Sequence, residues 1–552
     1  MIADIHITEK SFGDKTLMKD VKFSVDDGEK VGVVGRNGVG KSTLFGILSG
    51  KDTDYTGEVI FRRGITIATT AQEHHGLGEQ TVMTYILRGL PEYPELKKII
   101  DEYPLIMGDN MRKIEEYTQA LERFDQKGFY QVEEKIEREL MNFQLEGFGE
   151  RKISSLSGGQ KRLVEIVKIM HSEAHLALID EPTNHMDYVA KQQFIDWMNS
   201  QPHQAMLIIT HDRDVLGQAD RIVEIKDGQA VSYRGNYDTY LKQNAQATTA
   251  GMNNFEQIEK RIVNLKQKVL DYQRLKEKSR NPGTIQKFKR LENEVRAELE
   301  ELSEMEKPTF WIDKESVGQL DYKSAERYGK FKSRNIRLSM KDASSRSQHV
   351  LVRAENVAVG IGERILFEDV NIDLREGEAI EIRGRNGAGK TTLIRMILAS
   401  GKSFDGGPVL YSGDIFLDPQ VRIGVYEQEI DERYLSDPLE KAIEKLYMSR
   451  DLSISDTKIR QLLADYLFTD ADRMTPLARL SGGQKARFQI ISMLANDPQL
   501  LVLDEPTNHL DLPSIEELET ALAKYSGAIL YVSHDNYFRE KLGGKVVQIG
   551  AE

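Results

Sequence analysis

The 552-residue sequence contains no cysteine. This absence excludes disulfide bonds, thiol catalysis and zinc or iron–sulfur sites with cysteine ligands, and it suits a reducing cytosol. No stretch approaches the roughly 18 uninterrupted apolar residues of a membrane-spanning helix. The first ten residues, MIADIHITEK, also lack the basic-then-apolar pattern of a secretion signal. We therefore expect a soluble, cytoplasmic protein, and its length indicates at least two domains.

The sequence has fewer basic than acidic residues. It contains 75 Lys and Arg residues and 88 Asp and Glu residues, which gives a formal net charge of −13. An acidic surface argues against non-specific binding of nucleic acid by the whole molecule. A local basic patch is still compatible with this balance, and one is present around the Asn-Pro-Gly sequence at 281–283.

The sequence contains the same ordered set of motifs twice. The pairs are GRNGVGKS (35–42) and GRNGAGKT (384–391), LSGGQ (156–160) and LSGGQ (480–484), LALIDEPTNHMD (176–187) and LLVLDEPTNHLD (500–511), and ITHD (209–212) and VSHD (532–535). The first copy has more residues between its glycine-rich loop and its LSGGQ motif, which indicates an insertion of about 32 residues near 90–135.

Each copy starts with an apolar strand, at 31–35 and 379–384, that leads into a glycine-rich loop and then a helix. Strands that alternate with helices predict a parallel sheet and an α/β fold for each copy. The second strand carries Glu381 and Arg383 where the first copy has Gly32 and Val34. We expect this face of the strand to be less buried or the two charges to be paired.

The glycine-rich loops match the phosphate-binding pattern G-x-x-x-x-G-K-[ST]. Glycines let backbone N–H groups turn toward phosphate oxygens, and the following helix N-terminus adds positive potential. Lys41 and Lys390 should reach the β- and γ-phosphates, and the hydroxyls of Ser42 and Thr391 should ligate Mg²⁺. The candidate ATP-binding residues of the loops are Gly35, Arg36, Asn37, Gly38, Val39, Gly40, Lys41, Ser42 and Thr43, and Gly384, Arg385, Asn386, Gly387, Ala388, Gly389, Lys390, Thr391 and Thr392.

Two adjacent carboxylates end a buried strand in each copy. Asp180 and Asp504 are suited to hold Mg²⁺ through water, and the next residue, Glu181 or Glu505, can polarise the attacking water as general base.

Two further pairs of residues recur at matching places. Gln72 and Gln428 are candidate ligands of the metal or of the lytic water, although a glutamine alone is more often a surface residue. His211 and His534 follow short β-branched strands, and we favour a catalytic contact with the γ-phosphate over a structural role.

The LSGGQ motifs provide a second anion site in each copy, because Ser-Gly-Gly before a helix leaves N–H groups open. One nucleotide site has no need of two such loops. We therefore expect each motif to face the nucleotide that is held by the other copy, so that two ATP molecules are clamped head to tail. The candidate residues are Ser157, Gly158, Gly159 and Gln160, and Ser481, Gly482, Gly483 and Gln484.

Together these motifs resemble those of the ATP-binding-cassette (ABC) ATPases, in which ATP and Mg²⁺ are the cofactors. The resemblance implies that Phe12 stacks on adenine, whereas Ile361 at the aligned position implies weaker stacking in the second site. It divides the chain into a first cassette (1–245, with an arm-like insertion at about 90–135), a linker (246–320) and a second cassette (321–552). It also implies a monomer whose two cassettes pair within the chain.

Between the copies, apolar residues recur with helical spacing over 252–275 and 285–305, and Asn281-Pro282-Gly283 interrupts them. This pattern predicts an antiparallel helical hairpin with its tip at about 276–287. A solvated helix face would normally mix charges, so the basic excess favours an RNA-facing tip. The basic residues of the tip are Arg274, Lys276, Lys278, Arg280, Lys287, Lys289 and Arg290. A second basic run at 323–341 could bind RNA or pack the linker on the second cassette.

Two cassettes joined by a charged helical hairpin resemble the ABC-F translation factors. The resemblance implies that the ATP-bound, closed form places the linker in the tRNA exit site of the ribosome, in contact with ribosomal RNA and the P-site tRNA, and that hydrolysis releases it. The use would be either rescue of stalled ribosomes or protection from ribosome-targeting antibiotics. The alternative is the ATPase subunit of a transporter with a separate membrane partner. We expect no membrane and no DNA as partner.

Overall fold

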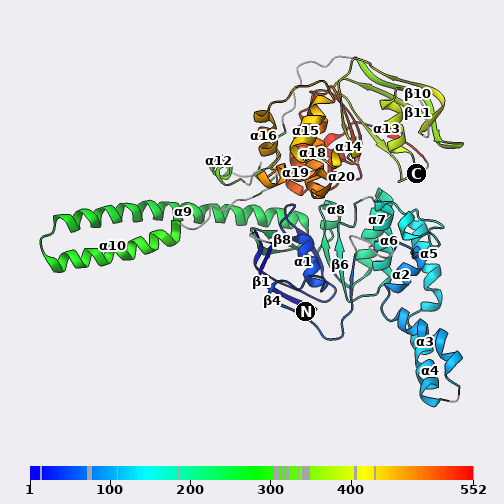
Figure 1. Ribbon diagram of the computed structural model, residues 1–552, viewed down its shortest axis with the longest axis horizontal. Helices are drawn as coiled ribbons and strands as arrows, with labels where there is room; N and C mark the ends of the chain where they lie inside the picture. The colour runs from blue at the N-terminus through cyan, green and yellow to red at the C-terminus, as the bar shows by residue number, and fades with distance from the viewer. Residues whose placement is uncertain are drawn as a thin grey trace. The chain divides into compact units, whose positions relative to one another are not determined.

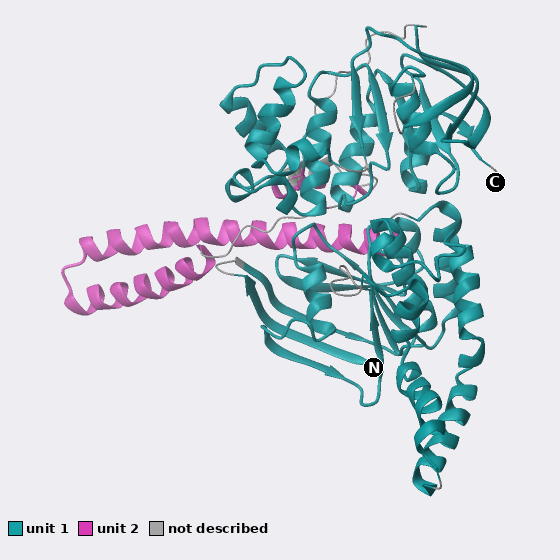
Figure 2. Ribbon diagram, turned by 45° about the vertical axis from the view of Figure 1, so that its right-hand side comes forward, with its two compact units in different colours: residues 1–237, 336–552 teal, residues 238–335 magenta. Residues whose placement is uncertain are grey.

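The computed structural model describes the chain except for residues 13–14, 71–77, 109, 185, 304–310, 312, 314–315, 318–321, 333–334, 339–348, 403–406, 428–429 and 551–552. The chain forms two compact units, one made of residues 1–237 and 336–552 and the other of residues 238–335 (Figure 2). Among the described residues, no helix is long and apolar enough to cross a membrane. The predicted metal or water ligands Gln72 and Gln428 lie outside the described residues.

The first copy of the motifs is built on a six-stranded sheet with the order β5-β6-β7-β3-β8-β9. Its strands are β5 (Ile67–Thr69), β6 (Leu176–Asp180), β7 (Ala205–Ile209), β3 (Lys30–Val34), β8 (Arg221–Lys226) and β9 (Gln229–Arg234). All neighbours are parallel except β8 and β9. Strands β3, β6 and β7 are buried along their whole length, as the apolar runs in the sequence require of a sheet covered on both faces.

The second copy repeats this arrangement with five parallel strands in the order β14-β15-β16-β12-β17. They are β14 (Ile423–Tyr426), β15 (Leu500–Asp504), β16 (Ala528–Val532), β12 (Ala379–Arg383) and β17 (Lys545–Gln548). The predicted α/β fold with two phosphate-loop cassettes is confirmed. In the same strand β12, Arg383 donates to both carboxylate oxygens of Glu381 at 2.7 and 2.8 Å, so the expected pairing of these charges is confirmed.

Each cassette also has a three-stranded antiparallel sheet that the sequence analysis did not predict. The strands are β1 (Ala3–Phe12), β2 (Lys15–Val25) and β4 (Thr56–Phe61) in the first cassette, and β10 (Val350–Ile361), β11 (Arg364–Arg375) and β13 (Pro408–Leu417) in the second. One face of each packs on the phosphate-loop helix through a shared apolar core. These sheets therefore fix the helix that follows each phosphate loop.

The helices after the functional loops recur in both copies. They are α1 (Lys41–Leu48) and α13 (Lys390–Leu398) after the phosphate loops, α6 (Gly158–His171) and α18 (Gly482–Leu494) after LSGGQ, α7 (Tyr188–Ser200) and α19 (Leu512–Ala523), and α8 (Arg213–Leu216) and α20 (Asn536–Leu542). Their amphipathic faces cover the parallel sheets and complete the cores of the cassettes.

The remaining helices of this unit precede the LSGGQ motifs in the chain. They are α2 (Val82–Arg88), α3 (Tyr93–Ile106), α4 (Met111–Gln126), η1 (Phe129–Gln131), α5 (Val132–Asn142) and η2 (Ile153–Ser155), and α14 (Glu432–Leu435), α15 (Leu439–Met448), α16 (Asp456–Asp465), α17 (Asp470–Arg473) and η3 (Leu477–Arg479). Helices α3 and α4 occupy the region 90–135, where Tyr93 packs on Phe124 and Phe129 with ring centroids 5.6 and 5.2 Å apart.

The second unit contains α9 (Tyr237–Lys278), α10 (Pro282–Ser303) and α12 (Tyr322–Phe331). Helices α9 and α10 lie antiparallel (Figure 1). Tyr272 stacks on Phe288 with 6.2 Å between ring centroids, and Arg261 pairs with Glu298 at 2.7 Å. In the turn between the helices, the side chain of Asn281 accepts a hydrogen bond from the Gly283 N–H at 2.9 Å. Such an Asx turn is a local reason for the chain to reverse here.

Candidate functional site

The two phosphate-loop lysines lie at the start of α1 and α13, buried at the end of the parallel sheet. The Lys41 ammonium donates to the carbonyl of Gly35 at 2.6 Å, and Lys390 donates to the carbonyl of Gly384 at 2.8 Å. Burial lowers the pKa of both lysines. The loops therefore curl around their own lysines, the shape that cradles a phosphate chain.

Glycine is required in these loops by the backbone. Gly40 and Gly389 precede the helices with φ of 102° and 98°, a region that side chains disfavour. At Gly35, a Cβ atom would lie 2.6 Å from the carbonyl oxygen of Ile225. Val39 and Ala388, which we expected to bind ATP, are half-buried against the apolar cores.

A hydroxyl and a carboxylate meet beside each loop. Ser42 Oγ donates to Asp180 Oδ2 at 3.1 Å, and Thr391 Oγ1 donates to Asp504 Oδ2 at 2.7 Å. The other oxygen of Asp504, Oδ1, is buried and has no hydrogen-bond partner within the described part of the chain. A buried acceptor of this kind beside a hydroxyl fits Mg²⁺, which prefers oxygen ligands and keeps waters and phosphates in its shell.

The two predicted catalytic glutamates have an uncommon backbone conformation. Glu181 and Glu505 follow the last strand residue with φ of 47° and 52°, in the left-handed region. Burial raises the pKa of Glu181 to about 8 and that of Glu505 to about 7. A carboxylate whose pKa lies near neutral pH is a stronger base than an ordinary glutamate. Both side chains lie close to a histidine of the same cassette.

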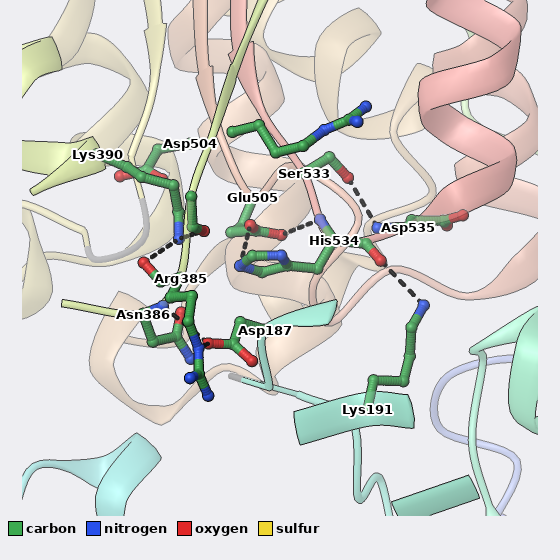
Figure 3. Close-up of polar contacts among 12 residues, drawn as sticks. Asp187, Lys191, Arg385, Asn386, Lys390, Asp504, Glu505, Ser533, His534 and Asp535 are labelled. Atoms are coloured by element: carbon green, nitrogen blue, oxygen red, sulfur yellow. Dashed lines mark hydrogen bonds and ion pairs between the residues drawn. The ribbon is translucent and has the colours of Figure 1, made fainter. Parts of the chain in front are cut away.

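The two histidines lie against these glutamates. His211 Nε2 is 3.6 Å from Glu181 Oε1, and His534 Nε2 is 3.3 Å from Glu505 Oε1. The backbone N–H of His534 also donates to Glu505 Oε2 at 3.2 Å (Figure 3). Burial lowers the pKa of His211 to about 3 and also that of His534, so both rings are neutral at pH 7.

Both LSGGQ motifs start a helix with a capping box. Ser157 Oγ accepts from the Gln160 N–H, and the Gln160 side chain accepts from the Ser157 N–H. Ser481 and Gln484 make the same pair of contacts. The Gln484 amide additionally donates to Asp472 at 2.7 Å. The capped turn leaves the glycines Gly158, Gly159, Gly482 and Gly483 at the helix entrance.

Two cavities bring residues of the two copies together, as the clamp interpretation requires. The larger, of about 940 Å³, is lined by Ser157–Gln160 of the first copy and by Asn386, Gly387, Gly389, Lys390, Thr391, Thr392, Asp504, Glu505 and His534 of the second. The smaller, of about 660 Å³, is lined by Asn37, Gly38, Gly40, Lys41, Ser42, Thr43, Asp180, Glu181 and His211 with Ser481, Gly482 and Gly483. Each cavity combines one phosphate loop with the opposite LSGGQ motif.

Two aspartates to which we assigned no role hold the phosphate loops across this interface. Asp187 Oδ2 accepts from the backbone N–H of Asn386 at 2.9 Å (Figure 3), and Asp511 Oδ2 accepts from the N–H of Asn37 at 3.1 Å. Arg36 and Arg385 flank these contacts, and Arg385 Nε lies 3.6 Å from Asp187 Oδ2. The signal was present, because both aspartates end the repeated DEPTNH-x-D sequence.

The two positions expected beside adenine differ as the sequence indicates. The Phe12 side chain is 58% exposed, and the Lys10 ammonium lies 4.8 Å from the centre of its ring. Ile361 is 54% exposed and lines the larger cavity with Arg364. One face of Phe12 is thus occupied by a cation, while Ile361 offers no ring. Stacking on adenine stays a prediction.

Most basic residues at the predicted tip are exposed. Within the hairpin, Lys276 pairs with Glu292 at 2.7 Å and Arg290 pairs with Glu294 at 2.9 Å. The other basic residues there are exposed and make no ion pair with any residue that the structure describes: Arg274, Lys278, Arg280, Lys287 and Lys289. Of the second basic run, Arg334 and Lys341 lie outside the described residues.

The family model described as "ABC transporter" matches residues 18–184 and 367–508, more than half of the chain. The chain belongs to this ABC transporter family. Both matched segments contain a phosphate loop, an LSGGQ motif and an Asp-Glu strand end. As an ABC protein with two cassettes, it is an ATP hydrolase, and this prediction is confirmed.

Relatives of this ABC protein align with almost its whole length. ABC transporter F family member 2 of Arabidopsis thaliana is 29% identical over 98% of this chain and 75% of its own length. Ribosome protection protein VmlR of Bacillus subtilis is 27% identical over 96% of this chain and 83% of its own. The energy-dependent translational throttle protein EttA of Mycobacterium tuberculosis is 28% identical over 96% and 88%. The expected resemblance to the ABC-F group is confirmed.

A solved structure shares the fold of this ABC protein. The RNase-L inhibitor structure superposes with a TM-score of 0.57, covering 99% of this chain and 88% of its own, at 18% sequence identity. At this identity the likeness concerns the arrangement of the elements. It agrees with the twin-cassette α/β fold described above.

Proposed function

We propose that this protein is an ATP-driven, ribosome-binding translation factor of the ABC-F type. The observation that carries the proposal is the cluster of exposed, unpaired cations at the α9–α10 turn of an otherwise acidic ATPase. Lys and Arg at a helical turn are suited to phosphates of structured RNA. Two aligned relatives, VmlR and EttA, carry names that refer to ribosome protection and translation.

In this proposal the two cavities bind ATP between the cassettes. Lys41 and Lys390 hold the β- and γ-phosphates, while the LSGGQ glycines offer N–H groups to the same nucleotide from the opposite side. The Ser42–Asp180 and Thr391–Asp504 pairs would hold Mg²⁺, which would supply positive charge for the phosphates when it is bound.

Hydrolysis then depends on residues that already lie together. Glu181 and Glu505 accept the proton of the attacking water as general bases, and the neutral His211 and His534 donate to the γ-phosphate. Loss of that phosphate removes the link between a phosphate loop and the opposite LSGGQ motif. The two half-sites then separate, and the protein is released from its partner.

The hairpin is the element that engages the ribosome in this proposal. Its basic tip enters the tRNA exit site and contacts ribosomal RNA and the P-site tRNA. Two uses follow from the same contact, namely action on stalled ribosomes and protection from ribosome-targeting antibiotics. They differ in an observable way, because only protection raises the antibiotic concentration that arrests protein synthesis.

The double variant Glu181→Gln, Glu505→Gln tests the proposal. It should bind ATP, hydrolyse it poorly, co-sediment with ribosomes in ATP and slow translation in a cell extract. The same variant without ATP is the control and should stay in the supernatant. Co-sedimentation with membrane vesicles in place of ribosomes would contradict the proposal and favour the motor of a transporter.

A second set of variants tests the tip. Arg280→Glu, Lys287→Glu and Lys289→Glu together should weaken ribosome binding of the trapped protein, while basal ATPase activity stays within about twofold. The matched control reverses three exposed lysines of the first cassette, Lys19, Lys22 and Lys51. Equal loss of ribosome binding in the control would show that only the total charge matters and would reject the tip.

A further inference from the structure

Lys191 lies at the start of α7 in the first cassette and reaches the main chain of the second. Its side chain is almost completely buried, with 4% of the residue exposed. The ammonium donates to the carbonyl oxygen of His534 at 2.9 Å (Figure 3) and pairs with Asp214 at 2.6 Å and Asp212 at 3.3 Å. Burial alone would lower the pKa of Lys191, but the two aspartates raise it, so the ammonium stays charged.

The carbonyl that Lys191 contacts belongs to a residue of the ATPase machinery. The N–H of His534 donates to Glu505 Oε2 at 3.2 Å, and its ring lies 3.3 Å from Glu505 Oε1. The peptide groups on both sides of His534 are thus held, one by the glutamate of its own cassette and one by a lysine of the opposite cassette. A shift of Lys191 would therefore move the ring of His534 relative to Glu505.

Lys191 belongs to the segment that also contacts the phosphate loop of the same site. Asp187, four residues earlier, accepts from the Asn386 N–H at 2.9 Å. The segment 187–191 consequently touches the second ATP site at two points, its phosphate loop and its histidine. Both contacts exist only while the cassettes lie together.

The first ATP site has no equivalent lysine. When the repeated motifs are aligned, Ile515 takes the place of Lys191 and Tyr537 takes the place of Asp214. Isoleucine has no donor for a carbonyl, and Ile515 is buried in the apolar core of the second cassette. The duplicated chain is therefore unequal at this position. Among the described residues, a charged donor of the opposite cassette reaches the carbonyl of the histidine in the second site alone, whereas in the first site the opposite cassette brings the Asp511 carboxylate near His211.

We propose that Lys191 is a positioning residue for the second ATP site. It couples closure of the cassettes to the orientation of His534 and Glu505, so that hydrolysis at this site depends on the opposite cassette through a contact that the first site lacks. The proposal concerns the ATPase reaction and does not require the ribosome.

A second buried ion pair crosses the same interface between the cassettes and provides a control for the Lys191 variants. Arg213 lies 3.0 Å from Glu519, and its guanidinium covers the ring of Tyr537 at 5.2 Å. No contact of Glu519 with either catalytic histidine is recorded for the described residues. Glu519→Gln removes this ion pair, and Glu519 itself contacts neither Lys191 nor His534 among the described residues, so this variant is the matched control.

The experiment measures single-turnover ATP hydrolysis in two backgrounds. Glu181→Gln leaves the second site active, and Glu505→Gln leaves the first. Lys191→Met should slow hydrolysis at least tenfold in the Glu181→Gln background, with less than a twofold change in the half-saturating ATP concentration. It should change the rate less than twofold in the Glu505→Gln background. Lys191→Arg, which keeps a charged donor, should restore at least a third of the lost rate.

Three results would overturn the proposal. They are an equal loss in both backgrounds, an unchanged rate in the Glu181→Gln background, and the same site-selective loss for Glu519→Gln. Thermal unfolding of each variant monitors the fold. If Lys191→Met does not yield folded protein, Lys191→Gln serves in its place, because its amide remains polar beside Asp212 and Asp214.

Discussion

Glu181 and Glu505 occupy left-handed backbone at the ends of β6 and β15, with nearly the same φ in both copies. For a residue with a side chain this conformation costs of order 1 kcal/mol or more, and such costs are concentrated at functional sites. Burial of the two carboxyl groups adds to the cost. Both features lower the stability of the nucleotide-free protein. Removing one of the carboxyl groups should therefore change that stability measurably.

Glu505→Gln should stabilise the nucleotide-free protein at alkaline pH. The pKa of Glu505 is raised from 4.5 to about 7, so its contribution to stability is complete below pH 4.5 and is lost as the pH rises through about 7. The variant avoids this loss. We expect its Tm to exceed that of the parent by roughly 5 °C at pH 8 and to equal it near pH 4.5, measured by calorimetry. The exposed Glu540→Gln is the control and should show no such difference.

Gly483→Ala should impair the first ATP site selectively. A Cβ atom at Gly483 would lie 2.1 Å from Asn37 Nδ2, which donates to the carbonyl of His509 at 3.0 Å. The methyl group must displace the Asn37 side chain and break that bond. We expect single-turnover hydrolysis to fall about tenfold when only the first site is active, with the second site nearly unchanged. Gly158→Ala is the control, because a Cβ atom at Gly158 would meet open space. If Gly158→Ala and Gly483→Ala reduced the hydrolysis rate equally, the expectation would be contradicted.

Among the elements, the central parallel strands β3, β6 and β7 with their counterparts β12, β15 and β16, and the helices after each loop, could be predicted, because apolar runs and glycine-rich loops are local signals. The outer strands β5, β8, β14 and β17 were not predicted. The two antiparallel sheets could not be predicted either, since their strands β1, β2, β10 and β11 are half-buried and rich in charge. Helix α9 starts at Tyr237, well before the heptad spacing that we recognised from 252. The contacts of Asp187, Asp511 and Lys191 depend on how the copies meet, which no single segment of sequence contains.

The hairpin of α9 and α10 has a buried acidic residue at the centre of its charge network. Glu292 accepts from Lys276 at 2.7 Å and from Arg296 at 2.9 Å, and these hydrogen bonds lower its pKa to about 2. Because the pKa is depressed, the stabilisation is present above pH 4.5 and is lost as the pH falls toward 2. Glu292 is therefore expected to hold the helices together under physiological conditions.

Glu292→Gln should loosen the hairpin while leaving the cassettes intact. Amide hydrogen exchange of the full-length protein at pH 7 should become several-fold faster in α10 and in the last turns of α9. Exchange in β6 and β15 should not change. The exposed Glu300→Gln, on the same helix, should match the parent. If both variants behave alike, Glu292 has no special part in the hairpin.

For the whole molecule, the net charge of −13 and the basic tip act in opposite directions on a polyanionic partner. Association through a few phosphate contacts releases counterions, so log K falls linearly with log salt concentration. We expect the affinity of the ATP-trapped variant for ribosomes to follow this law. Each reversal among Arg280, Lys287 and Lys289 should reduce the slope by about 1, measured by sedimentation at several KCl concentrations. A slope that does not change would place the contact elsewhere.

Each cassette supplies an aspartate to the phosphate loop of the other cassette. This arrangement decides how much of the chain one ATP site needs. Asp187 completes the loop of Lys390, and Asp511 completes the loop of Lys41. Each cavity is lined by residues of both halves, so the two copies can diverge in sequence while each proposed nucleotide site still needs both of them. A chain severed within the connecting segment would regain turnover only by reassembly, with a rate that grows with the product of the two fragment concentrations.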